Sequence, residues 1–265
     1  MVEVRRGGLL GVVLIVLILF VALAVIAAAL VMHGLENGEG FHFTPSKKVG
    51  TPHTLGEFNV TGVRLENVVG RVVVLGSNGS SLVVETNLPL EYRLNSTLTL
   101  YCPSKYGHNV CSDYEKGYVG IKAPHMESLR ADHLVGNLVL NVELGSLTVK
   151  GVVGNVIVRN TSTMVVNDVT GNVRGSCGKG VVSKVIGNVE VGALEGLTVS
   201  DVVGNVKVIL PENASLALKA DGSFTSKLRI GEGVYEGSYE LPVEIDNIVG
   251  NVVIEKGAFL ITPEG

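Results

Sequence analysis

Apolar and polar residues alternate on both sides of a short Gly-Asn step that recurs along the chain. The clearest copy reads Val152-Val153-Gly154-Asn155-Val156-Ile157-Val158. The residues two before and two after each glycine are Val, Leu or Ile in every copy, and the residue four after it is apolar in all but one. Such period-two alternation is typical of strands with one buried face. The seven steps are Gly70-Arg71, Gly136-Asn137, Gly154-Asn155, Gly171-Asn172, Gly187-Asn188, Gly204-Asn205 and Gly250-Asn251.

The spacing of these steps predicts a stack. From Gly136 to Gly204 the glycines recur about every 17 residues, which suits one coil that carries two short strands. A second apolar pair follows most of them some ten residues later: Leu147/Val149, Met164/Val166, Leu197/Val199 and Leu216/Leu218. We therefore predict an all-β fold, a β-solenoid-like stack of two-strand coils over 125–257.

The Gly-Asn step has a physical reason at a sharp turn. Gly adopts φ > 0 without steric cost, and Asn tolerates left-handed backbone better than most residues. In an in-register stack the asparagines would lie roughly 4.8 Å apart, and their amides would hydrogen-bond along it. Three residues before the glycines runs a partly polar column, in which we expect weak attraction between opposite charges: His133, Gly151, Asp168, Lys184 and Asp201.

An uncharged apolar run over 9–32 is long enough to cross a bilayer as a helix. Arg5-Arg6 precede it, and Glu36 and Glu39 follow, so the positive-inside bias places 1–8 in the cytoplasm and the rest outside. Two alternatives stay open. One is a cleaved secretory peptide, whose apolar region is normally about 7–15 residues; the other is a processing site of the archaeal type IV pilin kind at Arg5-Arg6-Gly7.

Between this run and the repeats we predict two regions. Residues 33–57 are rich in Gly and Pro and read as a linker. Residues 58–124 read as two antiparallel hairpins that begin a β ectodomain extending to 257. The hairpin strands are expected at Val72–Leu75 with Leu82–Glu85, joined by Asn78-Gly79, and at Leu98–Tyr101 with Val119–Ala123.

The order of these elements resembles a known family. A hairpin, a Thr-Leu-x-Leu strand, the step from Ile121 to Pro124, tandem Val-x-Gly-x-Val coils and the Leu210–Ser215 segment follow one another as in the putative adhesin family, domains of unknown function on bacterial and archaeal envelopes. The resemblance covers roughly 58–256. It implies a β-solenoid-like ectodomain and no established reaction. Where that family often has Ser-Gly-Asp, this chain has Val-Gly-Asn, which removes the carboxylates that a calcium role requires.

Three cysteines bear on the compartment. Cys102 and Cys111 lie in one loop on the predicted outer side, where a disulfide between them is permitted. A metal pair with His108 is the alternative, although three ligands without a fourth make a poor zinc site. For the remaining Cys177 a buried, idle thiol is the first interpretation and an intermolecular bridge the second.

Acceptor patterns for N-glycosylation, Asn-x-Ser/Thr, occur at five predicted turns or strand ends. They begin at Asn59, Asn78, Asn95, Asn160 and Asn213.

Charge and motifs argue against other functions. The net charge of −4 and pI near 5.9 provide no basic stripe for nucleic acid. We predict no catalytic residue, cofactor or metal site, because the acidic residues stand mostly singly at turns and no hydrolase, zincin or phosphate-loop motif is present. His125 and His133 are interpreted as single surface histidines.

The segment 219–247 interrupts the repeat. The last step lies 46 positions beyond Gly204, so we expect irregular coils in the gap. An open end exposes unpaired strand edges, so we expect a cover from the tail (258–265), chiefly Ala258–Ile261, or from the segment around Tyr235.

The sequence thus predicts a membrane-anchored cell-envelope ectodomain with a structural or adhesin-like role, whose partners are the membrane and an envelope protein or glycan. A sensory or regulatory ectodomain that partners a membrane protein is the main alternative. A pilin-like subunit and a carbohydrate-active β-helix enzyme are the less favoured alternatives. The oligomeric state is left open.

Overall fold

The computed structural model describes residues 47–221 and 227–258. All of these residues belong to one compact unit, which begins at Lys47. Within this described part no helix has the length and apolarity that a membrane crossing requires. The predicted cytoplasmic segment 1–8, the apolar run 9–32, the first part of the linker and the tail from residue 259 lie outside the described residues.

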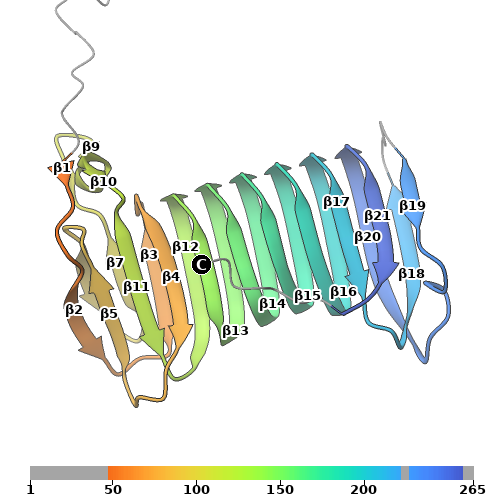
Figure 1. Ribbon diagram of the computed structural model, residues 1–265, viewed down its shortest axis with the longest axis horizontal. Helices are drawn as coiled ribbons and strands as arrows, with labels where there is room; N and C mark the ends of the chain where they lie inside the picture. Colours follow the sequence, from red (N-terminus) through yellow and green to blue (C-terminus); the bar gives the residue numbers. More distant parts are fainter. Residues whose placement is uncertain (1–46, 222–226, 259–265) are drawn as a thin grey trace, which may run out of the picture. The chain divides into compact units, whose positions relative to one another are not determined.

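The described residues are all-β, apart from one 3-10 turn, η1 (Val110–Asp113). The repeats form long parallel strands side by side: β12 (Met126–Val135), β13 (Leu138–Val153), β14 (Val156–Thr170), β15 (Val173–Ile186) and β16 (Val189–Val203). Equivalent positions pair, so that Val152 lies opposite Leu134 on one side and Val169 on the other. Figure 1 shows these strands following one another along the stack.

Each repeat contributes to two sheets that meet at the Gly-Asn step, here called the corner. Segments that precede a corner pair with each other and form the pre-corner sheet, and segments that follow a corner form the post-corner sheet. The chain returns from the post-corner to the pre-corner sheet at a second bend, where the pairing register shifts, for example between Val158 and Thr161. The stack therefore has a corner edge and, opposite it, a bend edge.

The first coil consists of β3 (Gly62–Glu66) and β4 (Arg71–Gly76), with Gly70 at its corner. Strands β12 and β13 pair with one side of this coil. Strands β7 (Leu98–Tyr101) and β11 (Tyr118–Ala123) pair with the other side. The chain thus lays down its first coil, covers that coil's outer side, and only then returns to begin the repeats.

Both predicted hairpins are wrong. Strand β11 lies between β4 and β5 (Leu82–Thr86), parallel to the first and antiparallel to the second. The antiparallel partner of β7 is β6 (Glu91–Leu94). Alternation could not reveal this arrangement, because inward residues such as Val74 and Val84 are buried whichever strand stands beside them.

The predicted linker ends earlier than residue 57. Strand β2 (His53–Phe58) pairs antiparallel with β5, and the short β1 (Lys47–Lys48) pairs with β10 (Tyr114–Glu115). Only Phe58 of these two N-terminal strands is buried. Main-chain hydrogen bonds therefore hold the strands in place, and the sequence shows no apolar alternation from which they could be predicted. A further small pair, β8 (Ser104–Lys105) with β9 (His108–Asn109), lies in the cysteine loop.

At the other end of the stack the chain forms outer strands first and then returns to complete the coil beneath them. After β17 (Val206–Leu210) the chain forms β18 (Ala214–Asp221) and β19 (Leu228–Ile230), and then returns with β20 (Tyr239–Val249) and β21 (Val252–Lys256). Strand β20 inserts between β16 and β18, and β21 inserts between β17 and β19. The irregular segment predicted to fill the gap is therefore an outer cover, and the last coil stacks directly on the regular repeats.

The segment around Tyr235 covers the end of the stack as predicted, but the buried residue is Val234 and not Tyr235. Val234 is fully buried, and its carbonyl accepts a hydrogen bond of 2.9 Å from the Leu216 amide, while the Tyr235 ring is exposed. Ala258 is exposed, and the rest of the expected Ala258–Ile261 cover lies outside the described residues.

The core is a continuous column of inward aliphatic side chains. The residues two before and two after every corner glycine are at most 1% exposed. Burying a valine of this kind contributes about 1.5–3 kcal/mol. At Gly175, the one exception four residues after a corner, an added Cβ would stand 2.9 Å from the Val158 Cβ and 3.6 Å from the Met164 Sδ, so neighbouring side chains already fill that space.

Candidate functional site

The corner edge is the most regular surface of the molecule, and its glycines are required by close stacking. A Cβ on Gly154 would stand 2.1 Å from the carbonyl oxygen of Gly136, and the same clash recurs from Gly136 to Gly250 at 1.9–2.1 Å. The corner glycines also have φ between +137° and +150°, a region that side-chain-bearing residues rarely adopt. Each glycine therefore lets the next coil approach to main-chain contact.

The column three residues before the corner glycines adopts left-handed backbone. Its φ values lie between +50° and +68°, which explains its Asn, Asp and Gly content. The members are Asn67, His133, Gly151, Asp168, Lys184, Asp201 and Asn247. Within the column Asn247 donates a 2.7 Å hydrogen bond to the Asp201 carboxylate. Turn geometry, more than mutual charge attraction, accounts for these residue types.

The corner asparagines form the ladder that the sequence predicts. The backbone amide of Asn155 donates to the Asn137 Oδ1 at 3.0 Å, and the contact repeats for Asn172, Asn188, Asn205 and Asn251 at 3.0–3.1 Å. Three of the side-chain amides add a bond of 3.2–3.3 Å to the same oxygen. The ladder crosses from Asn205 to Asn251 although the two are 46 positions apart.

Beside the ladder runs an exposed aliphatic column that sequence reasoning missed. We call it the corner stripe: the residue directly before each corner glycine, paired in register along the stack. Five of its members are 47–61% exposed. The stripe comprises Val69, Val135, Val153, Thr170, Ile186, Val203 and Val249. The Val-Val-Gly sequences could have predicted this column, because neighbouring residues of a strand face opposite sides. When the first valine faces inward, the second must face outward.

A hollow of about 440 Å³ lies on this edge. Its walls include Val69, Val135, Val153 and Thr170 of the stripe and His133 of the left-handed column. The stripe thus has a concave, largely aliphatic section near the first coils. This arrangement suits burial against another apolar surface, with His133 and Asp168 among the polar residues that line it.

Charged side chains are paired on the outer faces. Arg174 lies 3.0 Å from Glu190 on the post-corner sheet, and Lys207 lies 2.9 Å from Glu255. Exposed pairs of this kind contribute about 0–1 kcal/mol each.

One carboxylate on the pre-corner sheet is nearly buried. The Asp132 Oδ2 lies 2.6 Å from the Arg130 Nε and 3.0 Å from an Arg64 guanidinium nitrogen. Burial acts to raise the pKa of Asp132, but hydrogen bonds and positive charge from Arg130 and Arg64 outweigh it, so the pKa lies below the ordinary 3.8. Asp132 is therefore a structural anion that ties β12 to β3.

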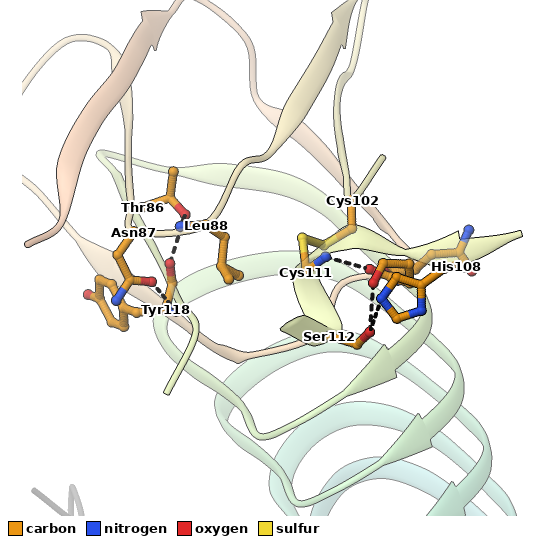
Figure 2. Close-up of a disulfide and its surroundings, with 10 residues drawn as sticks. Thr86, Asn87, Leu88, Cys102, His108, Cys111, Ser112 and Tyr118 are labelled. Carbon is orange, nitrogen blue, oxygen red and sulfur yellow. Dashed lines mark hydrogen bonds between the residues drawn. A yellow bond between two sulfur atoms is a disulfide. The ribbon is translucent and has the colours of Figure 1, made fainter. Parts of the chain in front are cut away.

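Cys102 and Cys111 form a disulfide, with 5.7 Å between their Cα atoms (Figure 2). Both are buried at the outer end of the stack. His108 is not a metal ligand with them: its Nε2 lies 2.6 Å from the Asp113 Oδ1. That hydrogen bond holds the pKa of Asp113 below its ordinary value, with Lys47 adding to the effect.

Polar side chains at the end of β5 hold Tyr118, the first residue of β11, as Figure 2 also shows. The Thr86 hydroxyl donates to the Tyr118 carbonyl at 2.8 Å and accepts from the Leu88 amide, and the Tyr118 amide donates to the Asn87 Oδ1 at 2.7 Å. Cys177, the third cysteine, is buried in β15, and burial raises the pKa of its thiol to about 12. Its Sγ donates to the Gly192 carbonyl.

The structure brings the predicted corner residues together and the acceptor asparagines to the surface. Asn59, Asn78, Asn95, Asn160 and Asn213 are all exposed. His125 lies apart from His133, in a bend-edge hollow of about 340 Å³ with Glu143 and Glu195. Across 47–221 and 227–258 no three His, Cys, Asp or Glu side chains are grouped so as to hold a metal ion.

Comparison with known proteins identifies similar solved structures. No protein-family model matches the chain, and no curated protein matches it. A structure titled as a putative adhesin from Bacteroides fragilis NCTC 9343 is 13% identical over 78% of this chain and 99% of that one, with a TM-score of 0.41. A putative cell adhesion protein from Clostridium sporogenes ATCC 15579 is 15% identical over 78% and 98%, with a TM-score of 0.32.

A third similar structure is that of a protein with a different name. It is a putative lipid binding protein from Parabacteroides distasonis ATCC 8503, 14% identical over 80% of this chain and 100% of that one, with a TM-score of 0.34. The solved structures similar to this chain thus include proteins that bear the name of the family that its sequence resembles.

Proposed function

We propose that this chain is a membrane-anchored protein of the cell envelope, whose ectodomain is a β-solenoid with a structural, adhesin-like role and no catalytic activity. The observation that carries the proposal is the corner edge, on which the stripe runs in register from Val69 of the first coil to Val249 of the last, beside a ladder that runs from Asn137 to Asn251. The ectodomain presents a rigid, repetitive surface to an envelope partner.

Rigidity follows from how the coils are joined. From Asn137 onward each corner adds a ladder bond to the parallel strand pairing, and glycine leaves no side chain to hold neighbouring coils apart. Main-chain and amide bonds therefore fix the spacing of every exposed side chain along the edge. A partner that binds several coils meets a surface already in its bound geometry, which lowers the entropic cost of association.

The chemistry of the stripe favours a protein partner over a glycan. Single exposed valines are ordinary, but an aligned column of aliphatic side chains with one threonine, Thr170, among them is an apolar surface of the kind that marks interaction sites. Covering it gains about 25 cal/mol per Å² removed from water. Glycans present mainly hydroxyl groups, which branched aliphatic side chains do not satisfy.

The anchor is the apolar run 9–32, with the ectodomain on the outer side. The Cys102–Cys111 disulfide supports this orientation, since disulfides persist outside the reducing cytosol. Full-length chain with an N-terminal tag tests it in intact cells. We expect resistance to alkaline extraction, and cleavage of the ectodomain but not of the tag by added protease; an untouched ectodomain would reject the orientation.

Adhesion is tested with cells that display the full-length chain over immobilised envelope material. Ile186→Ser with Val203→Ser removes two stripe side chains that are 61% and 53% exposed, and we expect at least a several-fold loss of retained cells. Val165→Ser with Val181→Ser is the matched control, because these valines are exposed on the pre-corner sheet. Equal retention of all three proteins, or loss in the control alone, would refute the stripe as the binding surface.

A further inference from the structure

The five acceptor asparagines, far apart in sequence, gather on the bend edge. Asn160 lies at a second bend itself, between Val158 of the post-corner sheet and Thr161, where the strand register shifts. Asn78 follows the end of β4, and the amide of its neighbour Ser77 donates 2.9 Å to the Ala123 carbonyl at the end of β11.

The other three follow the same rule. Asn59 lies between β2 and Gly62, which pairs with Ser128 at the start of the pre-corner segment of β12. Asn95 is in the turn between β6 and β7, where Leu98 pairs with Val63. Asn213 stands between the end of β17 and Ala214, the first residue of β18. Four of the acceptors thus lie where the chain enters or leaves a strand at the bend edge, and Asn160 lies at the bend within β14.

The corner edge carries none of these patterns. The residue two positions after each corner asparagine is Val, Ile, Arg, Glu or Lys, never Ser or Thr. The Oδ1 atoms of the corner asparagines from Asn137 to Asn205 accept ladder hydrogen bonds. At the bend edge, in contrast, the acceptor side chains are exposed, as are Thr61, Ser80 and Ser162, the third residues of three patterns.

We propose that the bend edge is an N-glycosylated edge and that the corner edge is left bare. This inference rests on the proposed outer location of the ectodomain. The co-reactant is an oligosaccharide whose anomeric carbon is linked through phosphate to a lipid carrier. A bond forms between the asparagine Nδ2 and that carbon, the carbon–oxygen bond to phosphate breaks, the lipid phosphate leaves, and the amide nitrogen loses one proton.

The consequence is a division of the surface. Sugars on the bend edge hydrate and shield the side on which the hollow of His125, Glu143 and Asn160 opens. The corner stripe, on the opposite edge, stays accessible to a protein partner. Because sugars would keep a partner away from the bend edge, a partner protein can pack only against the corner edge, and this difference fixes the orientation in which the ectodomain binds.

The test is peptide mass spectrometry on full-length chain isolated from its own membranes. We expect sugar masses on peptides that contain the bend-edge acceptors and none on corner-asparagine peptides. Asn78→Gln and Asn95→Gln are each expected to remove one sugar increment from the intact mass. Asn141→Gln is the matched control: Asn141 also lies near this edge, but Glu143 occupies the third position, so the glycan mass should not change.

Two outcomes separate this inference from the proposed function. If protease added to intact cells reaches the ectodomain and all five acceptor peptides are unmodified, the glycosylated edge is refuted while the outer location stands. If protease does not reach the ectodomain, the outer location fails and takes the inference with it. Sugar on a corner asparagine would overturn the division between the two edges.

Discussion

The carbonyl oxygen of Gly204 lies 1.9 Å from the point where a Cβ on Gly250 would stand, although 46 positions separate the two glycines. The same main-chain approach joins every neighbouring pair of corners from Gly70 to Gly204. The final coil therefore continues a column that the sequence interrupts, and glycine is required at each corner by its neighbour as well as by its own backbone angle.

A methyl group at a central corner should be strongly destabilising. In Gly171→Ala the new Cβ would stand 2.1 Å from the Gly154 oxygen, at a φ of +144°. We expect a loss of at least about 3 kcal/mol, measured as a lower denaturant midpoint for the full-length chain. Gly79→Ala is the control, since its nearest neighbour would be 3.8 Å away. A change within about 0.5 kcal/mol at both positions would contradict close stacking at the corner.

The ladder should contribute through its oxygen more than through its nitrogen. Asn172→Ala leaves the Asn188 amide without its 3.0 Å acceptor, and we expect a cost of about 1–2 kcal/mol in unfolding free energy. Asn172→Asp keeps an acceptor oxygen and should lose less near pH 4 than at pH 7, because an ionised carboxylate would face the Asn155 Oδ1. An alanine variant as stable as wild type would show that water replaces the ladder without cost.

Acid should weaken the tie between β12 and β3. The folded pKa of Asp132 is below 3.8, so its ionised form contributes stability that is fully present above the unfolded pKa and is lost as pH falls through the folded pKa. Because both arginines are about half exposed, we expect Asp132→Asn to cost about 1 kcal/mol at pH 7. The difference should shrink as pH falls below about 3.8.

Unfolding curves at several pH values provide the measurement. Asp168→Asn removes one carboxylate from an exposed corner position and serves as the control for net charge. A gap between Asp132→Asn and wild type that widens with acidification would have the wrong sign for a salt-bridged carboxylate.

The cysteines should report their states by thiol counting. The folded chain should show no thiol reactive at pH 8, because Cys102 and Cys111 are joined and the pKa of buried Cys177 is raised to about 12. Unfolding without reductant should expose one thiol, and reduction should expose three. Three reactive thiols in the unreduced, unfolded chain would show that the Cys102–Cys111 disulfide is absent, and two would show that one cysteine is bound to another molecule.

Much of the repeat could be predicted from sequence, because a period of two fixes which side of a strand each residue faces. Val152, Val156 and Val158, for example, are predicted to be core residues from the alternation alone, and all three are buried. What alternation cannot specify is the neighbour. Nothing in Val72–Leu75 reveals that β11 stands between it and Leu82–Glu85, since both partners satisfy the same buried positions.

The candidate site was missed for a related reason. Once Val152 is assigned inward, Val153 must face outward, so the residue before the corner glycine is exposed; it is aliphatic at every corner except Gly171, where it is Thr170. The bend edge was equally hidden, because the five acceptors lie on one edge only after strand order is known. Asn59 and Asn213 lie at opposite ends of the described stack and share no local sequence context beyond the acceptor pattern itself.

The most direct test of the in-register column is cross-linking across the interruption. Val203 and Val249 are paired neighbours on the corner stripe and are both exposed. The double variant Val203→Cys/Val249→Cys should therefore cross-link in high yield with a short bismaleimide. Val135→Cys/Val203→Cys, four coils or roughly 19 Å apart at the usual strand spacing, should not. No link between 203 and 249, with the chain folded, would contradict the continuous stack on which the account depends.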